Sequence, residues 1–181
     1  KFVLVDMVDM IKQAIDYTMP KWKHMAQAKG LDYQIDKTDI KKIPAVNGNP
    51  SELKEVLVNI INNALDAMPE GGTLAFHTWE KNSTVYVSIS DTGEGMYEDV
   101  QMKIFDPFFS TKLPTGSGLG LSAVYGIMTR HGGKIKVVSE VGNGSTFILS
   151  LPMAGGHSGQ SISSESPFYS TENSLSILIV D

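Results

Sequence analysis

Three asparagines lie close together in a stretch that repeats apolar residues at the spacing of an α-helix. Asn59 and Asn63 are one helical turn apart, and Asn62 directly precedes the second of them. At about 100° per residue, Asn59, Asn63, Glu55 and Asp66 fall within an arc of roughly 80° on one side of this helix. Because Asn costs up to about 0.7 kcal/mol relative to Ala inside a helix, three of them in one stretch require an explanation.

Amide and carboxylate oxygens on one helix face suit a hard cation. Mg²⁺ keeps several waters, takes one or two protein ligands and completes its coordination shell with phosphate. Since the chain has no cysteine, thiolate metal sites and disulfides are excluded, and the composition fits a reducing cytosol. The alternative interpretation is a solvated polar face that binds nothing. This helix alone leaves both interpretations open.

Two glycine-rich stretches offer further binding chemistry. Residues 91–95 (Asp-Thr-Gly-Glu-Gly) follow a predicted strand. Glycines there allow a ligand to approach the backbone, and a buried carboxylate can accept a hydrogen bond from an amine. By spacing alone, this pattern is a turn as often as a site. Residues 116–121 (Gly-Ser-Gly-Leu-Gly-Leu) open a predicted helix, whose N-terminal N–H groups suit phosphate oxygens.

Several other functions are excluded. The dinucleotide fingerprint fails because Leu121 occupies its third glycine position, and neither a Gly-x-x-x-x-Gly-Lys-Ser/Thr loop nor the protein-kinase signatures occur. The 15 Lys and Arg against 20 Asp and Glu give a net charge of −5, which does not favour a nucleic-acid surface. No apolar run approaches the roughly 20 residues that cross a bilayer, so we expect no membrane contact by this chain.

The elements that position these residues follow from periodicity. The central helix is predicted from Asn49 and Pro50 to Met68, and its core side comprises Leu53, Val56, Leu57, Ile60, Ile61, Ala64, Leu65 and Met68. Other helices are predicted over residues 2–29 with an interruption near Pro20, over 97–103 and over 119–131. Strands are predicted over 31–35, 43–46, 73–80, 84–90, 134–140 and 145–151, the last four as two hairpins. Residues 105–117 have little regular pattern, which favours a mobile lid.

Four stretches, in this order, resemble the N, G1, F and G2 boxes of the ATP-binding domain of sensor histidine kinases. They are the asparagine helix, residues 91–95, residues 105–109 (Phe-Asp-Pro-Phe-Phe) and residues 116–121. The resemblance covers residues 2–152 and implies the Bergerat fold. This is an α+β, two-layer α/β sandwich whose mixed, mostly antiparallel sheet is covered on one face by helices. ATP and Mg²⁺ are the implied cofactors.

The resemblance also implies residue roles. Asn63 is similar to the Mg²⁺ ligand of the family, and Asn59 supports the metal and the phosphates. Asp91 is similar to the aspartate that reads adenine, and Thr146 to a threonine that holds adenine through water. Lys112 is placed to neutralise the γ-phosphate.

Further implied nucleotide contacts come from the same four boxes. They are Asp66, Gly93, Gly95, Met96, Phe105, Gly116, Ser117, Gly118, Leu119, Gly120 and Leu121. Phe105, Phe108 and Phe109 are expected to anchor the lid by packing, although plain core aromatics explain them equally well. Many relatives have a basic residue at the position of Asp66, so phosphate contact from this helix is in doubt.

The position one turn before Asn63 bears on the reaction. Gyrase-like relatives carry a water-activating Glu there, whereas Asn59 cannot act as a base. We therefore expect transfer of the γ-phosphoryl group to an external nucleophile rather than rapid hydrolysis. Two alternatives stay open: an ATPase that uses Glu55 as its carboxylate, and a nucleotide-sensing module without kinase activity.

The nucleophile is expected outside this sequence. None of the four histidines, His24, His77, His131 and His157, lies in the pattern of a phospho-acceptor. The resemblance implies an acceptor on a dimerisation domain upstream, so that the complete protein would be a homodimer.

The chain is expected to have three parts. Residues 1–152 form the catalytic domain, and residues 153–174 form a flexible linker rich in Gly and Ser. Residues 175–181 (Leu-Ser-Ile-Leu-Ile-Val-Asp) resemble the first strand of a receiver domain. The parent protein would then be a hybrid histidine kinase. This part of it is expected in the cytoplasm, and a membrane anchor in other regions of the parent stays open.

Overall fold

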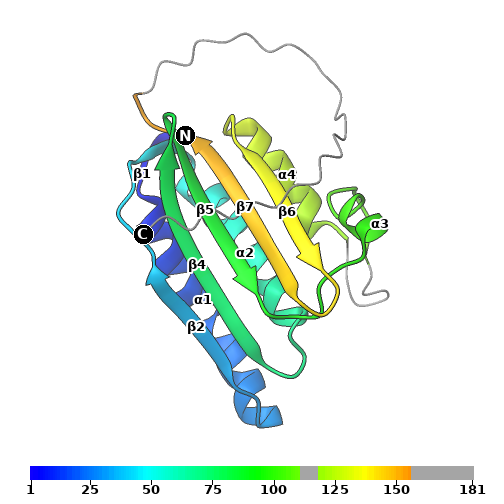
Figure 1. Cartoon of the computed structure of the whole chain (residues 1–181). Helices are drawn as coiled ribbons and strands as arrows, with labels where there is room; N and C mark the ends of the chain where they lie inside the picture. The colour runs from blue at the N-terminus through cyan, green and yellow to red at the C-terminus, as the bar shows by residue number, and fades with distance from the viewer. Residues whose placement is uncertain (111–117, 156–181) are drawn as a thin grey trace.

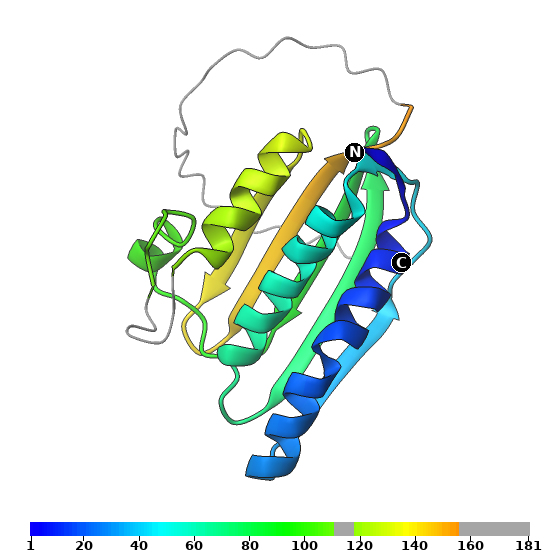
Figure 2. The ribbon, with the colours of Figure 1, turned by 180° about the vertical axis from the view of Figure 1, so that it is seen from behind.

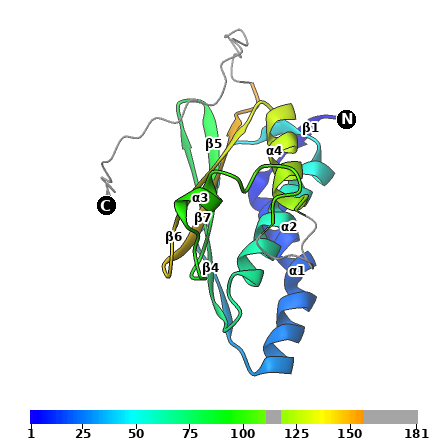
Figure 3. The same cartoon turned by 90° about the vertical axis from the view of Figure 1, so that its right-hand side faces the viewer.

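The computed structural model describes residues 1–110 and 118–155. These form two layers, a five-stranded sheet and three helices that all lie on one face of it (Figure 1, Figure 2), and Figure 3 shows the two layers edge-on. The covering helices are α1 (Met7–Lys29), α2 (Pro50–Asp66) and α4 (Gly120–Arg130). The strands of the sheet are β2 (Tyr33–Asp39), β4 (Gly72–Lys81), β5 (Thr84–Asp91), β6 (Lys134–Glu140) and β7 (Gly144–Pro152).

The strand order is β2-β4-β5-β7-β6. Only the β2–β4 pair among these is parallel, and the other three neighbouring pairs are antiparallel. The predicted α+β sandwich, with a mixed and mostly antiparallel sheet covered on one face, is therefore confirmed. No described helix is long and apolar enough to cross a membrane.

Helix α2 is the centre of the core. It lies between α1 and α4 and packs on the sheet (Figure 2). Asn49 caps it by accepting a hydrogen bond from the Ser51 N–H at 3.1 Å, and Pro50 occupies its first turn. All eight apolar residues predicted for its core side are buried, namely Leu53, Val56, Leu57, Ile60, Ile61, Ala64, Leu65 and Met68.

The helix predicted over residues 2–29 is wrong at its N-terminus. Residues Val3–Val5 form the strand β1, which pairs antiparallel with β3 (Val46–Gly48) in a small second sheet. Helix α1 begins after it because the Asp6 carboxylate accepts hydrogen bonds from the N–H groups of Val8 and Asp9 at 2.8 and 3.3 Å.

The interruption predicted near Pro20 does not occur, because α1 continues to Lys29. Pro inside a helix costs about 3 kcal/mol. Trp22 and Ala26, beyond the proline, pack against the core, and we attribute the continuity of the helix to these contacts.

Two early strands differ from their predicted positions. Strand β2 runs to Asp39 rather than Ile35, since β4 supplies backbone partners for polar residues that show no apolar alternation. The second extended segment is shifted from residues 43–46 to β3, where its partner is β1. Pairing with strands distant in sequence determined both boundaries.

The two predicted hairpins are confirmed. The β4–β5 turn places Asn82 and Ser83 at φ values of 51° and 58°, the left-handed pair that a two-residue type I′ hairpin turn requires. The short predicted helix is α3 (Glu98–Gln101). The predicted Lys112, Gly116 and Ser117 contacts, the linker beyond residue 155 and the receiver strand lie outside the described residues.

Candidate nucleotide-binding site

Asn59 and Asn63 lie half-buried on α2, and neither side chain has a hydrogen-bond partner among the described residues. The first turn of α4 lies close to them, since a Cβ added at Gly120 would be 3.6 Å from Asn59 Oδ1. The first N–H groups of a helix have no partner within it. The Asn59 amide and the N-terminus of α4 therefore face the same space, and Asn63 lies one turn further along the same side of α2. This arrangement fits a metal bound together with phosphate.

Asn62 and Asp66 have a different environment. The Lys21 ammonium of α1 lies 3.2 Å from the side-chain oxygens of both residues. Asp66, a predicted nucleotide contact, is thus placed in an ion pair with α1. Lys21 was missed in the sequence because it lies more than 40 residues away from its partners, outside every motif.

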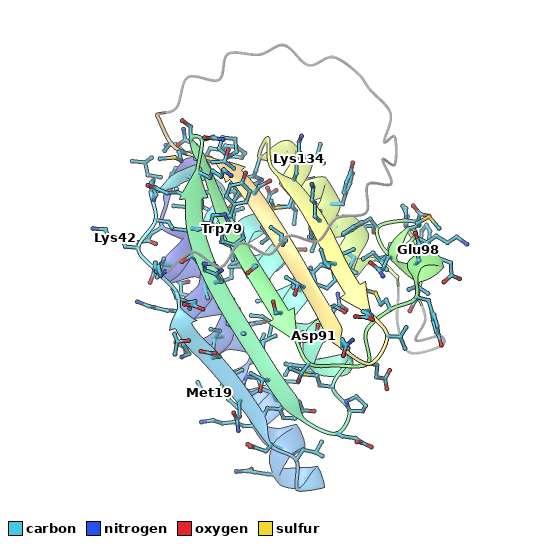
Figure 4. The ribbon with its side chains drawn as sticks, in the orientation of Figure 1. Met19, Lys42, Trp79, Asp91, Glu98 and Lys134 are labelled. Atoms are coloured by element: carbon cyan, nitrogen blue, oxygen red, sulfur yellow. The ribbon has the colours of Figure 1, made fainter. Side chains whose placement is uncertain are left out.

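Asp91 lies at the end of β5, at the same end of the sheet as the β6–β7 turn (Figure 4). Its side chain is buried, and Oδ1 accepts hydrogen bonds from the N–H groups of Gly93 and Ser145 at 2.9 and 3.2 Å. Burial raises the pKa of the Asp91 carboxyl, and these two hydrogen bonds oppose the shift. Oδ2 has no partner within the described residues, so it can accept a hydrogen bond from an amine.

The segment after Asp91 is held between α2 and the β6–β7 turn. The Glu94 N–H donates to Ala67 O at 3.0 Å, and the Gly142 N–H donates to Glu94 O at 2.7 Å. Gly95 has a φ of +68°, and a Cβ there would collide with Glu140 O. Only glycine fits at this position without displacing the turn.

Thr146 does not lie beside Asp91, so the role predicted for Thr146 at the adenine does not fit the structure. Side chains alternate across a strand, and Asp91 pairs in register with Ser145 rather than with Thr146. The Thr146 hydroxyl instead lies 2.8 Å from the hydroxyl of Ser90, on the uncovered face of the sheet.

Ser145 takes the position expected for Thr146. It is buried next to Asp91, and its hydroxyl lies 3.0 Å from the hydroxyl of Ser139, which donates to Gly144 O at 2.9 Å. We call Asp91, Gly93, Gly95 and Ser145 the Asp91 site. Its serine was missed because its face depends on the β5–β7 register, which the sequence does not show.

Two described residues, Phe108 within the predicted lid and Gly118 directly after it, are bonded to each other. The Phe108 N–H donates to Gly118 O at 3.0 Å, and both residues have a φ of 66°. Phe105 and Phe109 pack against the core, and the Phe105 ring lies 5.9 Å from that of Tyr125 on α4. Phe108 is 75% exposed, so its expected anchoring role is wrong.

The remaining predicted contacts flank this region. Met96 and Leu121 are half-buried and pack against the core, whereas Leu119 is exposed at the start of α4. The described histidines offer no acceptor in this region. His131 is buried and bonded at both ring nitrogens, His77 lies next to Trp79 on the sheet, and His24 is exposed on α1.

Comparison with known proteins identifies the family. Residues 48–155 match the family model described as histidine kinase-, DNA gyrase B-, and HSP90-like ATPase. The chain belongs to this family. The match contains the asparagine helix, the Asp91 site and α4, so these are parts of the ATP-binding domain of the family.

Individual relatives are histidine kinases. Sensor histidine kinase ZraS of Escherichia coli K12 is 37% identical over 126 residues, which are 70% of this chain and 27% of ZraS. The chain thus spans about a quarter of the length of this relative. The catalytic domain of histidine kinase ThkA superposes with a TM-score of 0.71 at 29% identity, covering 84% of this chain and 96% of that one. ThkA in complex with the response regulator protein TrrA matches with a TM-score of 0.64 at 27% identity, covering 84% of this chain and 42% of that one.

Proposed function

We propose that this domain binds Mg·ATP and transfers its γ-phosphoryl group to a histidine of a separate domain in two-component signalling. One observation carries the proposal: the Asp91 site and the amides of Asn59 and Asn63 are fixed to the same helix. Glu94 bonds to Ala67 at the end of α2, and Asn63 lies about 6 Å before Ala67 by helix rise. This separation suits a base and a triphosphate of one nucleotide.

The base would be recognised at the Asp91 site. Asp91 Oδ2 would accept a hydrogen bond from the adenine amine, while the N–H groups of Gly93 and Ser145 hold Oδ1 in place. The Ser145 hydroxyl would contribute a further polar contact, directly or through water.

The phosphates would lie between α2 and the start of α4. Asn63 would bind Mg²⁺ and Asn59 would support it, and the ion when bound would neutralise phosphate charge. Gly120 leaves room for phosphate oxygens near the helix end, whereas Gly118 is required because a Cβ there would collide with the Phe108 backbone. Lys112, Gly116 and Ser117 complete this proposed cradle on the resemblance of their motif.

Transfer would rest on placement and electrostatics. Asn59, one turn before Asn63, is an amide and cannot activate water. The domain would therefore keep ATP oriented until an external histidine approaches in line. We assign that histidine to an upstream dimerisation domain, so that the complete protein acts as a homodimer with this domain in the cytoplasm.

A receiver domain is the proposed destination of the phosphoryl group. Residues 175–181 resemble its first strand, and residues 153–174 would be the tether of a hybrid kinase. The complex of the related ThkA with a response regulator supports a partner of this kind.

Calorimetric titration tests the site. We expect wild-type protein to bind ATP more tightly with Mg²⁺ than without it. Asn63→Ala should remove this difference, and Asp91→Asn should weaken ADP binding by about tenfold or more, because it replaces the acceptor Oδ2. Asn62→Ala is the matched control, since Asn62 is bonded to Lys21 instead. Absence of nucleotide binding by the wild type would overturn the proposal.

The β5–β7 register gives a second comparison. Ser145→Ala should weaken ADP binding about fivefold, which corresponds to one hydrogen bond. Thr146→Ala should leave the affinity unchanged, because Thr146 lies on the other face of the sheet. The reverse result would show that the adenine contact comes from Thr146 after all.

A further inference from the structure

Gln101 of α3 makes two hydrogen bonds that link separate parts of the molecule. Its side-chain Nε2 donates to Met96 O at 3.0 Å and to Ser139 O at 2.9 Å. The side chain is half-buried, and an amide nitrogen carries two hydrogens. Both hydrogens are therefore used, each on a different backbone carbonyl.

The two carbonyls belong to opposite sides of the Asp91 site. Met96 ends the loop that starts at Asp91, whereas Ser139 lies on β6. The Ser139 hydroxyl is in turn bonded to Gly144 O and lies 3.0 Å from the Ser145 hydroxyl. The Gln101 amide thus links the loop that follows Asp91 to strand β6, whose Ser139 contacts Ser145.

Gln101 also lies at the start of the segment that leads from α3 to Phe108. Helix α3 leads through the buried Ile104 to Phe105, and then to Phe108, whose N–H is bonded to Gly118. Helix α3 therefore connects this segment to the loop between Asp91 and Met96. Gln101 is the side chain of α3 that contacts both the loop and β6 among the described residues.

We propose that Gln101 is a positioning residue for nucleotide binding, which holds the loop after Asp91 and strand β6 at the spacing that the base requires. The inference rests on the proposed binding of adenine nucleotides at this site. Gln101 acts through Met96 and Ser139 and need not touch the nucleotide itself.

The two hydrogen bonds of Gln101 restrict which side chain can replace it. Both partners are carbonyl acceptors, so only a donor with two hydrogens fits between them. Glutamate has the same shape but presents oxygen to oxygen, whereas lysine can donate to both carbonyls. The fold does not depend on this side chain alone, because Ile104 is buried and the backbone of Gln101 is bonded to Tyr97 O at 3.0 Å.

The test is ADP and ATP titration of four proteins: wild type, Gln101→Glu, Gln101→Lys and Gln27→Glu. We expect Gln101→Glu to weaken ADP and ATP by the same factor of about ten, since two carbonyls lose their donor. Gln101→Lys should stay within about threefold of the wild type. Gln27→Glu introduces the same charge on an exposed position of α1 and should change nothing.

A second measurement separates positioning from folding. Hydrogen exchange of the backbone amides of residues 104–109, apart from Pro107, which has none, should accelerate in Gln101→Glu. The melting temperature of this variant should stay close to that of Gln101→Lys. Wild-type affinity in Gln101→Glu would overturn this inference alone. A loss of affinity that follows a loss of folded protein would also overturn it. If the wild type binds no ADP, the proposed function fails and this inference fails with it.

Discussion

Asp91, which we propose recognises the base, lies in an environment that opposes its ionisation. Its carboxyl is buried, which raises its pKa because the charged form is desolvated. The folded state therefore binds the proton more tightly than the unfolded state. The stability that this proton provides is present below the ordinary pKa and is lost as the pH rises through the raised pKa. Ionising this buried carboxyl as the pH rises therefore costs stability.

Two outcomes follow for Asp91→Asn. Asparagine keeps an oxygen for the N–H groups of Gly93 and Ser145 but removes the buried charge. Without nucleotide, the variant should melt roughly 1 to 3 °C higher at pH 7, and this gain should disappear on acidification. Thermal unfolding at pH 7 and at pH 4, with Asp99→Asn on the exposed part of α3 as control, checks it. A lower melting temperature at pH 7 would contradict the argument.

At the scale of elements, His131 joins the two helices that flank the proposed phosphate region. Its side chain is fully buried at the end of α4, where Nδ1 lies 2.8 Å from Ile127 O. Nε2 accepts a hydrogen bond from the Asn49 N–H at 3.0 Å, at the N-terminus of α2. The neutral ring with its proton on Nδ1 satisfies both contacts. The Phe2 ring stacks on it at 4.5 Å.

His131→Phe should destabilise the fold by about 1 to 3 kcal/mol. Phenylalanine retains the stacking with Phe2 but leaves the Asn49 N–H without an acceptor. The control is Arg130→Ala, which removes a largely exposed ion pair with Glu52 and should cost well under 1 kcal/mol. Urea unfolding measures both changes. Equal losses of unfolding free energy in the two variants would mean that the buried hydrogen bond of His131 contributes no more than the exposed ion pair of Arg130.

The elements also show where sequence reasoning succeeds. The core side of α2 could be predicted because its apolar spacing is contained in one helix. By contrast, β1 was taken for helix, since its partner β3 lies far along the chain. Ser145 was passed over for its neighbour for the same reason, because only the pairing with β5 shows which of the two faces Asp91. The wrong predictions thus lie where the structure depends on the register between strands that are distant in the sequence.

At the scale of the whole molecule, the folding unit is larger than the matched family segment. Residues 48–155 contain Asn59, Asn63 and the Asp91 site, but they lack β1, α1 and β2. Helix α1 buries Met7, Met10, Ile11, Ala14 and Ile15. The Tyr33 hydroxyl of β2 donates to Met68 O at 2.9 Å. The segment that binds nucleotide in this proposal therefore depends on residues that precede it.

A truncation pair tests this dependence. Burying a large apolar side chain contributes about 1.5 to 3 kcal/mol, so the buried residues of α1 together contribute an amount comparable to the 5 to 15 kcal/mol of a typical domain. We expect residues 48–155 to show no cooperative thermal transition. Residues 1–155, which retain the whole described core, should melt and bind ADP like the full chain. Cooperative melting of 48–155 with intact ADP binding would show that α2 can keep its amides in place without α1, in which case the ion pair of Lys21 with Asp66 is no part of the binding architecture.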